Sequence, residues 1–278
     1  MHLFKKLFEF YIYSSLHVSL ATFSMTKITL ISNGISDNWI PIFVFCSTFI
    51  SYNFIRDIEF QNVAKHSFLI WFMKRRKNLF LISFVFTIIN TIIFFSPFFH
   101  WISLLVLIPF ALMTAFYAIP VIKINNKVYN LRNIPFLKIF TISISWAGIT
   151  VLFPISNFHF SFSLDVWLDF FQRILFVLII TLPFDIRDLK HDDISLQTFP
   201  QKIGIRNTKL VGVFFAILFC FLQFLHSYEF DKFSLINYII IAVSALFLIK
   251  SSEKQSKFYA SFFVEALPIV WLILLLLL

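Results

Sequence analysis

Long apolar runs are the feature of this sequence that most narrows what it can fold into. Nine runs approach the roughly 20 residues that an α-helix needs to cross a bilayer. They lie at about 8–32, 38–57, 78–97, 99–119, 135–153, 167–184, 208–227, 234–250 and 258–278. Only 13% of the residues are charged, whereas an ordinary soluble domain carries about 25%. The sequence therefore predicts an all-α, multi-pass membrane protein with nine transmembrane helices.

The first apolar run differs from the others because it carries polar side chains. These are Ser14, Ser15, His17, Ser19 and Ser24. Polar groups inside a span usually face protein or a polar cavity, so we expect this helix to turn away from lipid. A small basic region precedes the run, but no small-residue cleavage site follows it. The first span is therefore predicted to be retained.

The distribution of lysine and arginine predicts the orientation of the chain, because these residues concentrate in cytoplasmic loops. With nine spans and the N-terminus inside, inward-facing segments hold 20 of the 23 basic residues, and only Lys27, Arg173 and Lys232 fall elsewhere. The net charge of +9 is thus explained by topology, and no nucleic-acid partner is needed. We expect a protein of the cytoplasmic (inner) membrane.

The segment Asp185-Ile-Arg-Asp-Leu-Lys-His-Asp-Asp193 stands out against this apolar background. Asp185, Asp188 and Asp192 are spaced i, i+3 and i+7, which places them on one stripe of a helix. Closely spaced carboxylates repel one another and are commonly held by a cation. Oxygen ligands favour a hard ion such as Mg²⁺, which can bridge carboxylates to substrate phosphates. The alternative is a solvated interfacial helix in which Arg187 and Lys190 are the partners.

A second segment echoes this one 131 residues earlier. Asn53-Phe-Ile-Arg-Asp-Ile58 aligns with Phe184-Asp-Ile-Arg-Asp-Leu189 if Asp57 is placed on Asp188. The two long loops, 58–77 and 185–207, follow these segments on the same predicted side. We interpret the chain as one domain, 1–278, with a pseudo-repeat of about 1–130 and 131–257 and a last helix at 258–278. Two acidic helix ends related in this way can hold a diphosphate between metal ions, with its tail in the membrane.

With these motifs in place, the chain resembles the UbiA superfamily of intramembrane prenyltransferases. The resemblance rests on nine helices, an N-x-x-x-D segment after the second, and a D-x-x-D-x-x-x-D segment after the sixth. Ser195-Leu-Gln-Thr-Phe-Pro-Gln-Lys-Ile-Gly-Ile205 and the stretch from Tyr117 to Lys138 are also similar to the family. The resemblance implies a bundle of nine helices with a lateral or central cavity and cytoplasmic Asp-rich loops.

The first motif departs from the family pattern N-D-x-x-D-x-x-x-D. Asn53 and Asp57 match, but Phe54 and Gln61 stand where carboxylates are expected. A second register would use Glu59 as the last acid and would lose the other matches. The internal echo favours the first register. In either register this half-site has fewer acids than the family, so one metal position is uncertain.

The resemblance implies transfer of a prenyl group from an isoprenyl diphosphate donor to a lipophilic acceptor, with Mg²⁺ as cofactor. Asp185, Asp188 and Asp192 are the expected catalytic metal ligands, and Asp57 is a weaker one. The substrate-binding candidates are Asn53, Asp57, Tyr117, Lys123, Arg132, Lys138 and Arg187. Each basic residue among them has a second interpretation as an ordinary cytoplasmic-loop cation. Tyr52, Tyr117 and Trp146 are candidates to shield a carbocation through cation–π attraction.

Other polar residues within the spans are given structural roles. An intramembrane carboxylate is a functional candidate by default, but Glu265 is expected to partner a neighbouring polar helix. His17, Asn90 and His226 are treated in the same way. Asp169 and Arg173 are spaced i, i+4 and are expected to form a structural pair.

Two other functional classes remain open. The depleted first motif favours a UbiA-like protein that binds a lipid diphosphate or a quinone-like lipid without turnover. A transporter is the weaker alternative, because transporter sites commonly involve broken helices near the membrane midplane. The acids of this chain instead cluster at helix ends.

Overall fold

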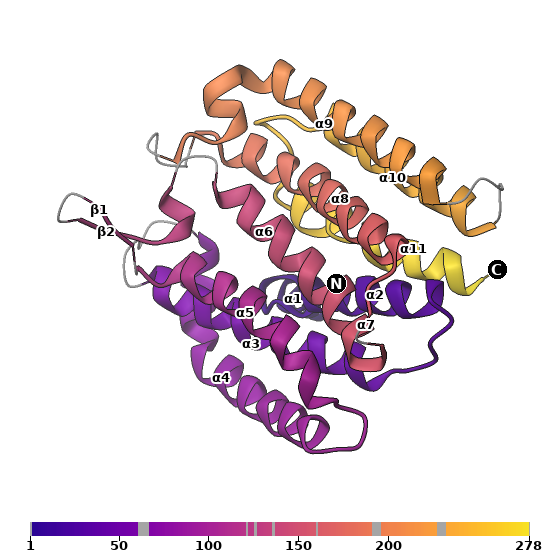
Figure 1. Cartoon of the computed structure of the whole chain (residues 1–278). Coiled ribbons are helices and arrows are strands. Elements are labelled where there is room, and N and C mark those ends of the chain that lie inside the picture. Colours follow the sequence, from indigo (N-terminus) through magenta and orange to yellow (C-terminus); the bar gives the residue numbers. More distant parts are fainter. Residues whose placement is uncertain are drawn as a thin grey trace.

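Long helices lying side by side make up most of the structure, which is a computed structural model (Figure 1). It describes residues 2–60, 67–120, 122–124, 127–134, 137–159, 161–190, 196–226 and 232–277. A small hairpin extends from one end of the helices, and the C-terminus lies at the other end. Within the described residues, this hairpin is the sole departure from helical secondary structure, with Ile122 opposite Tyr129 and Ile124 opposite Lys127.

The elements follow one another in a simple order. The N-terminal part contains α1 (His2–Tyr13), α2 (Leu16–Ser32), α3 (Trp39–Phe60), α4 (Ser67–Phe94), the 3₁₀ turn η1 (Trp101–Ser103), α5 (Leu104–Ala118), β1 (Ile122–Ile124), β2 (Lys127–Tyr129) and the 3₁₀ turn η2 (Leu131–Asn133). The C-terminal part contains α6 (Leu137–Ala147), the π-helical turn η3 (Gly148–Leu152), α7 (Phe153–Phe158), α8 (Leu164–Asp188), α9 (Phe199–His226), α10 (Lys232–Lys250), the π-helical turn η5 (Tyr259–Val264) and α11 (Leu267–Leu276).

Eight helical segments are long and apolar enough to cross a membrane among the described residues. They correspond to the predicted spans from the second to the ninth, so the prediction of a multi-pass helical membrane protein is confirmed at this level. Helices suit this solvent because they satisfy their backbone hydrogen bonds internally. The predicted first span, 8–32, is instead divided at Ser14 and Ser15 into α1 and α2. Ser15 has a φ of 76° at this break, and α2 has only 17 residues.

The polar residues of the first run are buried, as predicted. Ser14, Ser15, His17, Ser19 and Ser24 are each at most 1% exposed. Their polar groups are largely satisfied locally: Ser19 Oγ donates to the Ser15 carbonyl at 2.7 Å and Ser24 Oγ to the Leu20 carbonyl at 2.8 Å. Helix α2 can therefore lie inside the bundle because its hydroxyls bond to its own backbone.

The core lies around α8, which packs most closely against α9 and α6. Its buried side chains join those of α2, α9, α10 and α11 in one cluster. Gly212 on α9 permits this contact, because a Cβ there would collide with Leu248 and lie 2.9 Å from Leu182. By contrast, α4 and α5 expose most of their apolar surface. This outer surface is suited to lipid.

Helices α3 and α8 bring the two motifs to the same end of the bundle, the end that carries the hairpin (Figure 1). Asp57 lies in the last turn of α3, and Asp185 and Asp188 lie in the last turn of α8. The helical stripe predicted for the second motif thus ends at Asp188. Asp192 and Gln61 lie outside the described residues.

Candidate functional site

Asp185 is a buried carboxylate at the end of α8, with 3% of its surface exposed. Its Oδ1 lies 2.9 Å from Nζ of Lys138, the second residue of α6. Removing a carboxylate from water is costly unless it is paired and hydrogen-bonded. The Lys138–Asp185 ion pair provides that compensation and joins the beginning of α6 to the end of α8.

Asp188 lies one turn further along and is partly exposed. Arg187 binds it with two hydrogen bonds, Nε to Oδ1 at 2.7 Å and Nη2 to Oδ2 at 2.8 Å. The Arg187 guanidinium also lies 5.2 Å from the centre of the Phe184 ring. Asp188 is therefore held by a cation that also lies over an aromatic ring.

Asn53, the first residue of the depleted motif, is buried on α3. Its Nδ2 donates to the carbonyl oxygens of Ser14 at 3.0 Å and Phe49 at 2.9 Å. Its Oδ1 is buried and has no hydrogen-bond partner among the described residues. A buried carbonyl oxygen without a partner is costly. Asn53 Oδ1 is therefore available to a cation or to a hydrogen-bond donor.

Asp57 lies one helical turn after Asn53 and pairs with α4. Arg76 Nε lies 2.6 Å from Asp57 Oδ1, and Arg76 Nη2 donates to Oδ2 at 2.8 Å. About half of the Arg76 side chain is exposed. The Glu59 side chain lies outside the described part of α3, so the two registers of this motif are not compared by their contacts.

Two residues that the sequence analysis did not assign to the site, Arg56 and Glu265, link the motifs. Arg56 is the arginine of the first Ile-Arg-Asp segment and donates from Nη1 to the Tyr13 carbonyl at 2.7 Å and to Ser15 Oγ at 2.5 Å. The carboxylate of Glu265, between η5 and α11, interacts electrostatically with both Arg56 and Arg187. The repeated arginine was the sequence signal for this arrangement.

The other predicted substrate contacts are distributed around the same end. Tyr117 lies in the last turn of α5. Arg132 lies in η2, after the hairpin. Lys123 belongs to β1, and its side chain is outside the described part of the structure. Of the predicted cations, Lys138 and Arg187 are thus the two seen in contact with motif carboxylates.

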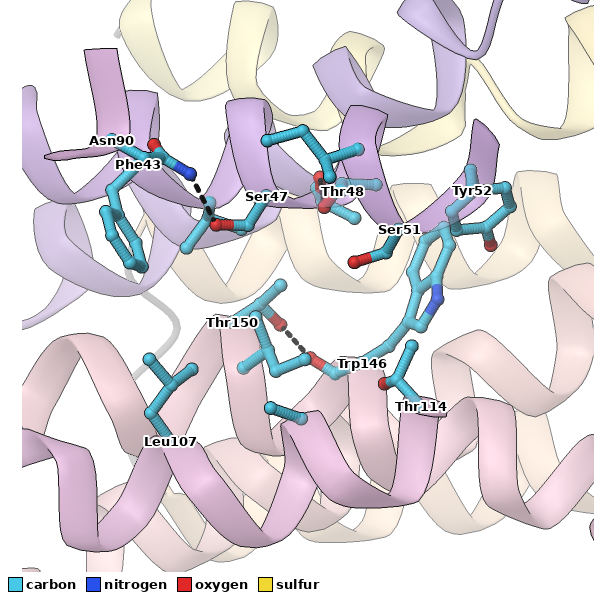
Figure 2. A pocket seen from close by; sticks show the side chains of 15 residues that line it. Phe43, Ser47, Thr48, Ser51, Tyr52, Asn90, Leu107, Thr114, Trp146 and Thr150 are labelled. Atoms are coloured by element: carbon cyan, nitrogen blue, oxygen red, sulfur yellow. Dashed lines mark hydrogen bonds between the residues drawn. The ribbon is translucent and has the colours of Figure 1, made fainter. Parts of the chain in front are cut away.

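A cavity of about 300 Å³ lies within the bundle behind the first motif. It is lined by Thr22, Phe43, Val44, Ser47, Thr48, Ile50, Ser51, Tyr52, Asn90, Leu107, Ala111, Thr114, Trp146, Ile149 and Thr150. Figure 2 shows Tyr52 beside Trp146 at one end of the cavity and the hydrogen bond from Asn90 to Ser47 toward the other. The α3 residues from Phe43 to Tyr52 span about 14 Å along the helix axis.

The cavity is mostly apolar and adjoins the polar residues of the site. Tyr52 directly precedes Asn53 in the chain, and its ring centre lies 6.5 Å from that of Trp146. Phe43 and Leu107 line the opposite part of the cavity (Figure 2). A ligand with a polar head near Asn53 can therefore place an apolar tail between α3, α5 and α6.

Oxygen atoms of the described motif residues form the candidate metal donor set. They are the Asp57, Asp185 and Asp188 carboxylates together with Asn53 Oδ1. Within the described residues, no cluster of three or more His, Cys, Asp or Glu side chains has metal-binding geometry. The third predicted ligand, Asp192, is outside those residues. The donor chemistry and the unpaired Asn53 oxygen fit a hard cation, which would replace contacts that Lys138 and Arg187 make here.

Comparison with known proteins identifies a shared fold. No protein-family model matches the sequence, and no curated protein matches it. A solved structure of digeranylgeranylglyceryl phosphate synthase in membranes superposes with a TM-score of 0.56 and 16% sequence identity. The alignment covers 98% of this chain and 96% of that one. The chain shares the fold of that synthase.

Proposed function

We propose that this chain is an integral-membrane prenyltransferase that moves an isoprenyl group from an isoprenyl diphosphate to a lipophilic acceptor. The observation that carries the proposal is the apolar cavity lined by Ser51 and Tyr52, the α3 residues that directly precede Asn53, in a fold shared with a membrane prenyltransferase. The cavity matches the tail of such a donor, and the charged helix ends match its diphosphate. The proposal includes nine spans, with α1 and α2 together as the first, and a cytoplasmic N-terminus.

The residues of the site have separate roles in this reaction. Lys138 and Arg187 provide positive charge for the diphosphate oxygens, since fixed cations stabilise charge that develops in the transition state. Asp185, Asp188, Asn53 and Asp57 would hold Mg²⁺. When bound, Mg²⁺ neutralises the diphosphate and makes it a better leaving group. The aromatic faces of Tyr52 and Trp146 lie along the path of the tail and can stabilise an allylic cation.

The bond changes balance as a substitution at the allylic carbon. The bond between that carbon and the diphosphate oxygen breaks, and the electron pair stays with the diphosphate. A new bond forms between the same carbon and the acceptor, which loses a proton. The apolar walls of the cavity exclude water, which would otherwise capture the cation as an alcohol.

The test is release of diphosphate from labelled donors of several chain lengths. The purified protein in lipid nanodiscs is given a membrane lipid extract as acceptor, and Mg²⁺ is varied. We expect diphosphate and a labelled lipophilic product to form together, with a high Mg²⁺ requirement because the first motif lacks two acids. Binding of the donor without consumption at any Mg²⁺ concentration would overturn the proposal.

A non-catalytic lipid-binding protein is the second candidate, and one observation favours it. Each described motif carboxylate already has a cationic partner: Lys138 for Asp185, Arg187 for Asp188 and Arg76 for Asp57. A site neutralised in this way can bind a ligand without activating a leaving group. The same assay separates the two functions, because only the enzyme releases diphosphate.

A further inference from the structure

A polar hydrogen-bond network lies at the opposite end of the bundle from the motifs. Gln223 on α9 is its centre: its Oε1 accepts from Gln172 Nε2 at 3.1 Å and from Asn237 Nδ2 at 2.8 Å. Gln223 Nε2 lies 3.2 Å from Ser234 Oγ, and Trp271 Nε1 donates to Asn237 Oδ1 at 3.0 Å. The network joins α8, α9, α10 and α11. So many buried polar side chains in one place are unusual for this apolar bundle, because each is costly to bury.

Arg173 stands beside this network and is not fully satisfied. It is 4% exposed, and its guanidinium lies 5.2 Å from the centre of the Trp271 ring. Nη2 donates to Thr29 Oγ1 at 3.2 Å, but Nη1 has no hydrogen-bond partner among the described residues. A buried cation with a free N–H group requires an acceptor. Arg173 therefore lacks one hydrogen-bond acceptor.

The pairing expected for Arg173 from sequence is wrong. No ion pair within 4.0 Å joins Asp169 and Arg173 in the described structure; the Asp169 carboxylate instead lies 3.6 Å from His226 Nε2. Asp169 and Arg173 interact over a longer distance. The short contacts of the guanidinium are instead with Trp271 and Thr29, on α11 and α2.

The space between these charges is a pocket of about 130 Å³. A single water needs only about 10–15 Å³ of such volume, so the pocket is large enough for a polar head group. Its lining includes the two charged groups, Asp169 and Arg173, together with Ser32, Gln223, His226 and Trp271. A carboxylate and a guanidinium thus share one small pocket that has both polar and apolar walls.

The pocket lies at the level where lipid head groups meet the protein. Two of its lining residues, Ser32 and His226, are the last residues of α2 and α9. Trp39, Trp101 and Trp167 stand at or near the starts of α3, η1 and α8, and each is at least 39% exposed. Tryptophan is enriched at the boundary between lipid and water. These helix ends therefore mark the second membrane interface.

Charge complementarity defines the ligand. A simple anion would meet the Arg173 guanidinium but also the Asp169 carboxylate, and a simple cation would meet the same conflict in reverse. A zwitterion satisfies both charges and supplies the missing acceptor. We propose that this pocket binds a zwitterionic head group of the phosphoethanolamine type, with phosphate oxygens at Arg173 and the ammonium at Asp169. This site is separate from the proposed transfer reaction at the other end.

Lipid retention by the intact protein tests this proposal. The purified chain is incubated with equal amounts of phosphatidylethanolamine, phosphatidylcholine and phosphatidylglycerol that carry identical acyl chains, and bound lipid is counted by native mass spectrometry. We expect phosphatidylethanolamine to be retained about tenfold over the others, the size expected for one charged hydrogen bond. Phosphatidylcholine lacks ammonium N–H donors, and phosphatidylglycerol lacks the positive charge.

Variants assign the selectivity to the pocket. Arg173→Gln and Asp169→Asn should each remove the preference, whereas Arg206→Gln, an exposed arginine on α9, should keep it. If Arg173→Gln does not fold, the test of lipid preference uses Asp169→Asn alone. The Asp169 side chain is 20% exposed, so this variant is the one expected to fold. Equal retention of the three lipids, or retention of phosphatidylglycerol above phosphatidylethanolamine, would overturn the proposal. Loss of bound lipid on addition of free phosphoethanolamine would support the same head-group chemistry and show that a soluble source suffices.

Discussion

Lys138 Nζ lies 2.9 Å from Oδ1 of Asp185, so the first acid of the second motif is neutralised by a lysine from a different helix. Both side chains are largely buried, at 15% and 5% exposure. The pair connects the stability of the bundle to its proposed chemistry. A diphosphate or a metal ion that binds Asp185 or Lys138 must compete with this contact.

Removing the lysine should destabilise the fold. In Lys138→Met, Asp185 stays buried without its cation, and we expect a loss of about 3–5 kcal/mol in the free energy of unfolding. Denaturant unfolding in detergent measures the loss. Arg76→Gln is the control, because the Arg76–Asp57 pair is exposed and should contribute under about 1 kcal/mol. Equal losses in the two variants would contradict the burial argument.

Asp188→Asn should abolish transfer and leave the fold intact. The carboxylate is partly exposed at a helix end, so its loss should change the free energy of unfolding by under about 1 kcal/mol. Diphosphate release and thermal unfolding are measured on the same sample. Full activity in Asp188→Asn would show that the metal assignment is wrong.

The register of the first motif is tested by two acids of α3. Asp57→Asn should weaken Mg²⁺ or diphosphate binding more than Glu59→Gln, because residues two apart lie about 200° around a helix and cannot face one ligand. Titration of each variant with Mg²⁺ and an isoprenyl diphosphate gives the ranking. The reverse ranking would favour the register that uses Glu59.

The cavity should limit the length of the donor tail. Leu107 lines its deep part, so Leu107→Trp should lower kcat/KM for long donors by about tenfold or more, as expected from overpacking, and should leave short donors nearly unchanged. Leu105→Trp is a matched control on the same helix, since Leu105 is 66% exposed. A uniform loss over all donor lengths would indicate a general packing defect.

The orientation of the chain can be tested with single cysteines. Cys46 and Cys220 are first replaced by serine, and Lys190→Cys or Asn38→Cys is then added. Both added positions are exposed. A membrane-impermeant thiol reagent should label residue 190 from the cytoplasmic side and residue 38 from the other side. Labelling of residue 190 from the outer side and of residue 38 from the cytoplasmic side would contradict the orientation predicted from the distribution of lysine and arginine.

Apolar periodicity and charge were sufficient to predict the class of fold. A bilayer requires each spanning segment to satisfy its own backbone, so run length alone predicted eight of the helices. The burial of Ser14, Ser15 and His17 was predicted because polar side chains within a span usually face protein. The division of the first run into α1 and α2 was not predictable in this way, because it lies at Ser15, which has a positive φ and accepts a hydrogen bond from Arg56 on another helix.

The sequence by itself determined which residues could carry charge at the helix ends, since Asp57, Asp185 and Asp188 stand out in an apolar chain. Only the tertiary structure decided their partners. Lys138 and Asp185 are 47 residues apart, and Glu265 meets Arg56 and Arg187 from the last span. Asp169 shows the same limit, because its i, i+4 spacing indicated Arg173, whereas in the structure His226 Nε2 from α9 lies 3.6 Å from its carboxylate. Pairing of buried charges depends on which helices are neighbours, and helical spacing reports only on residues of one helix.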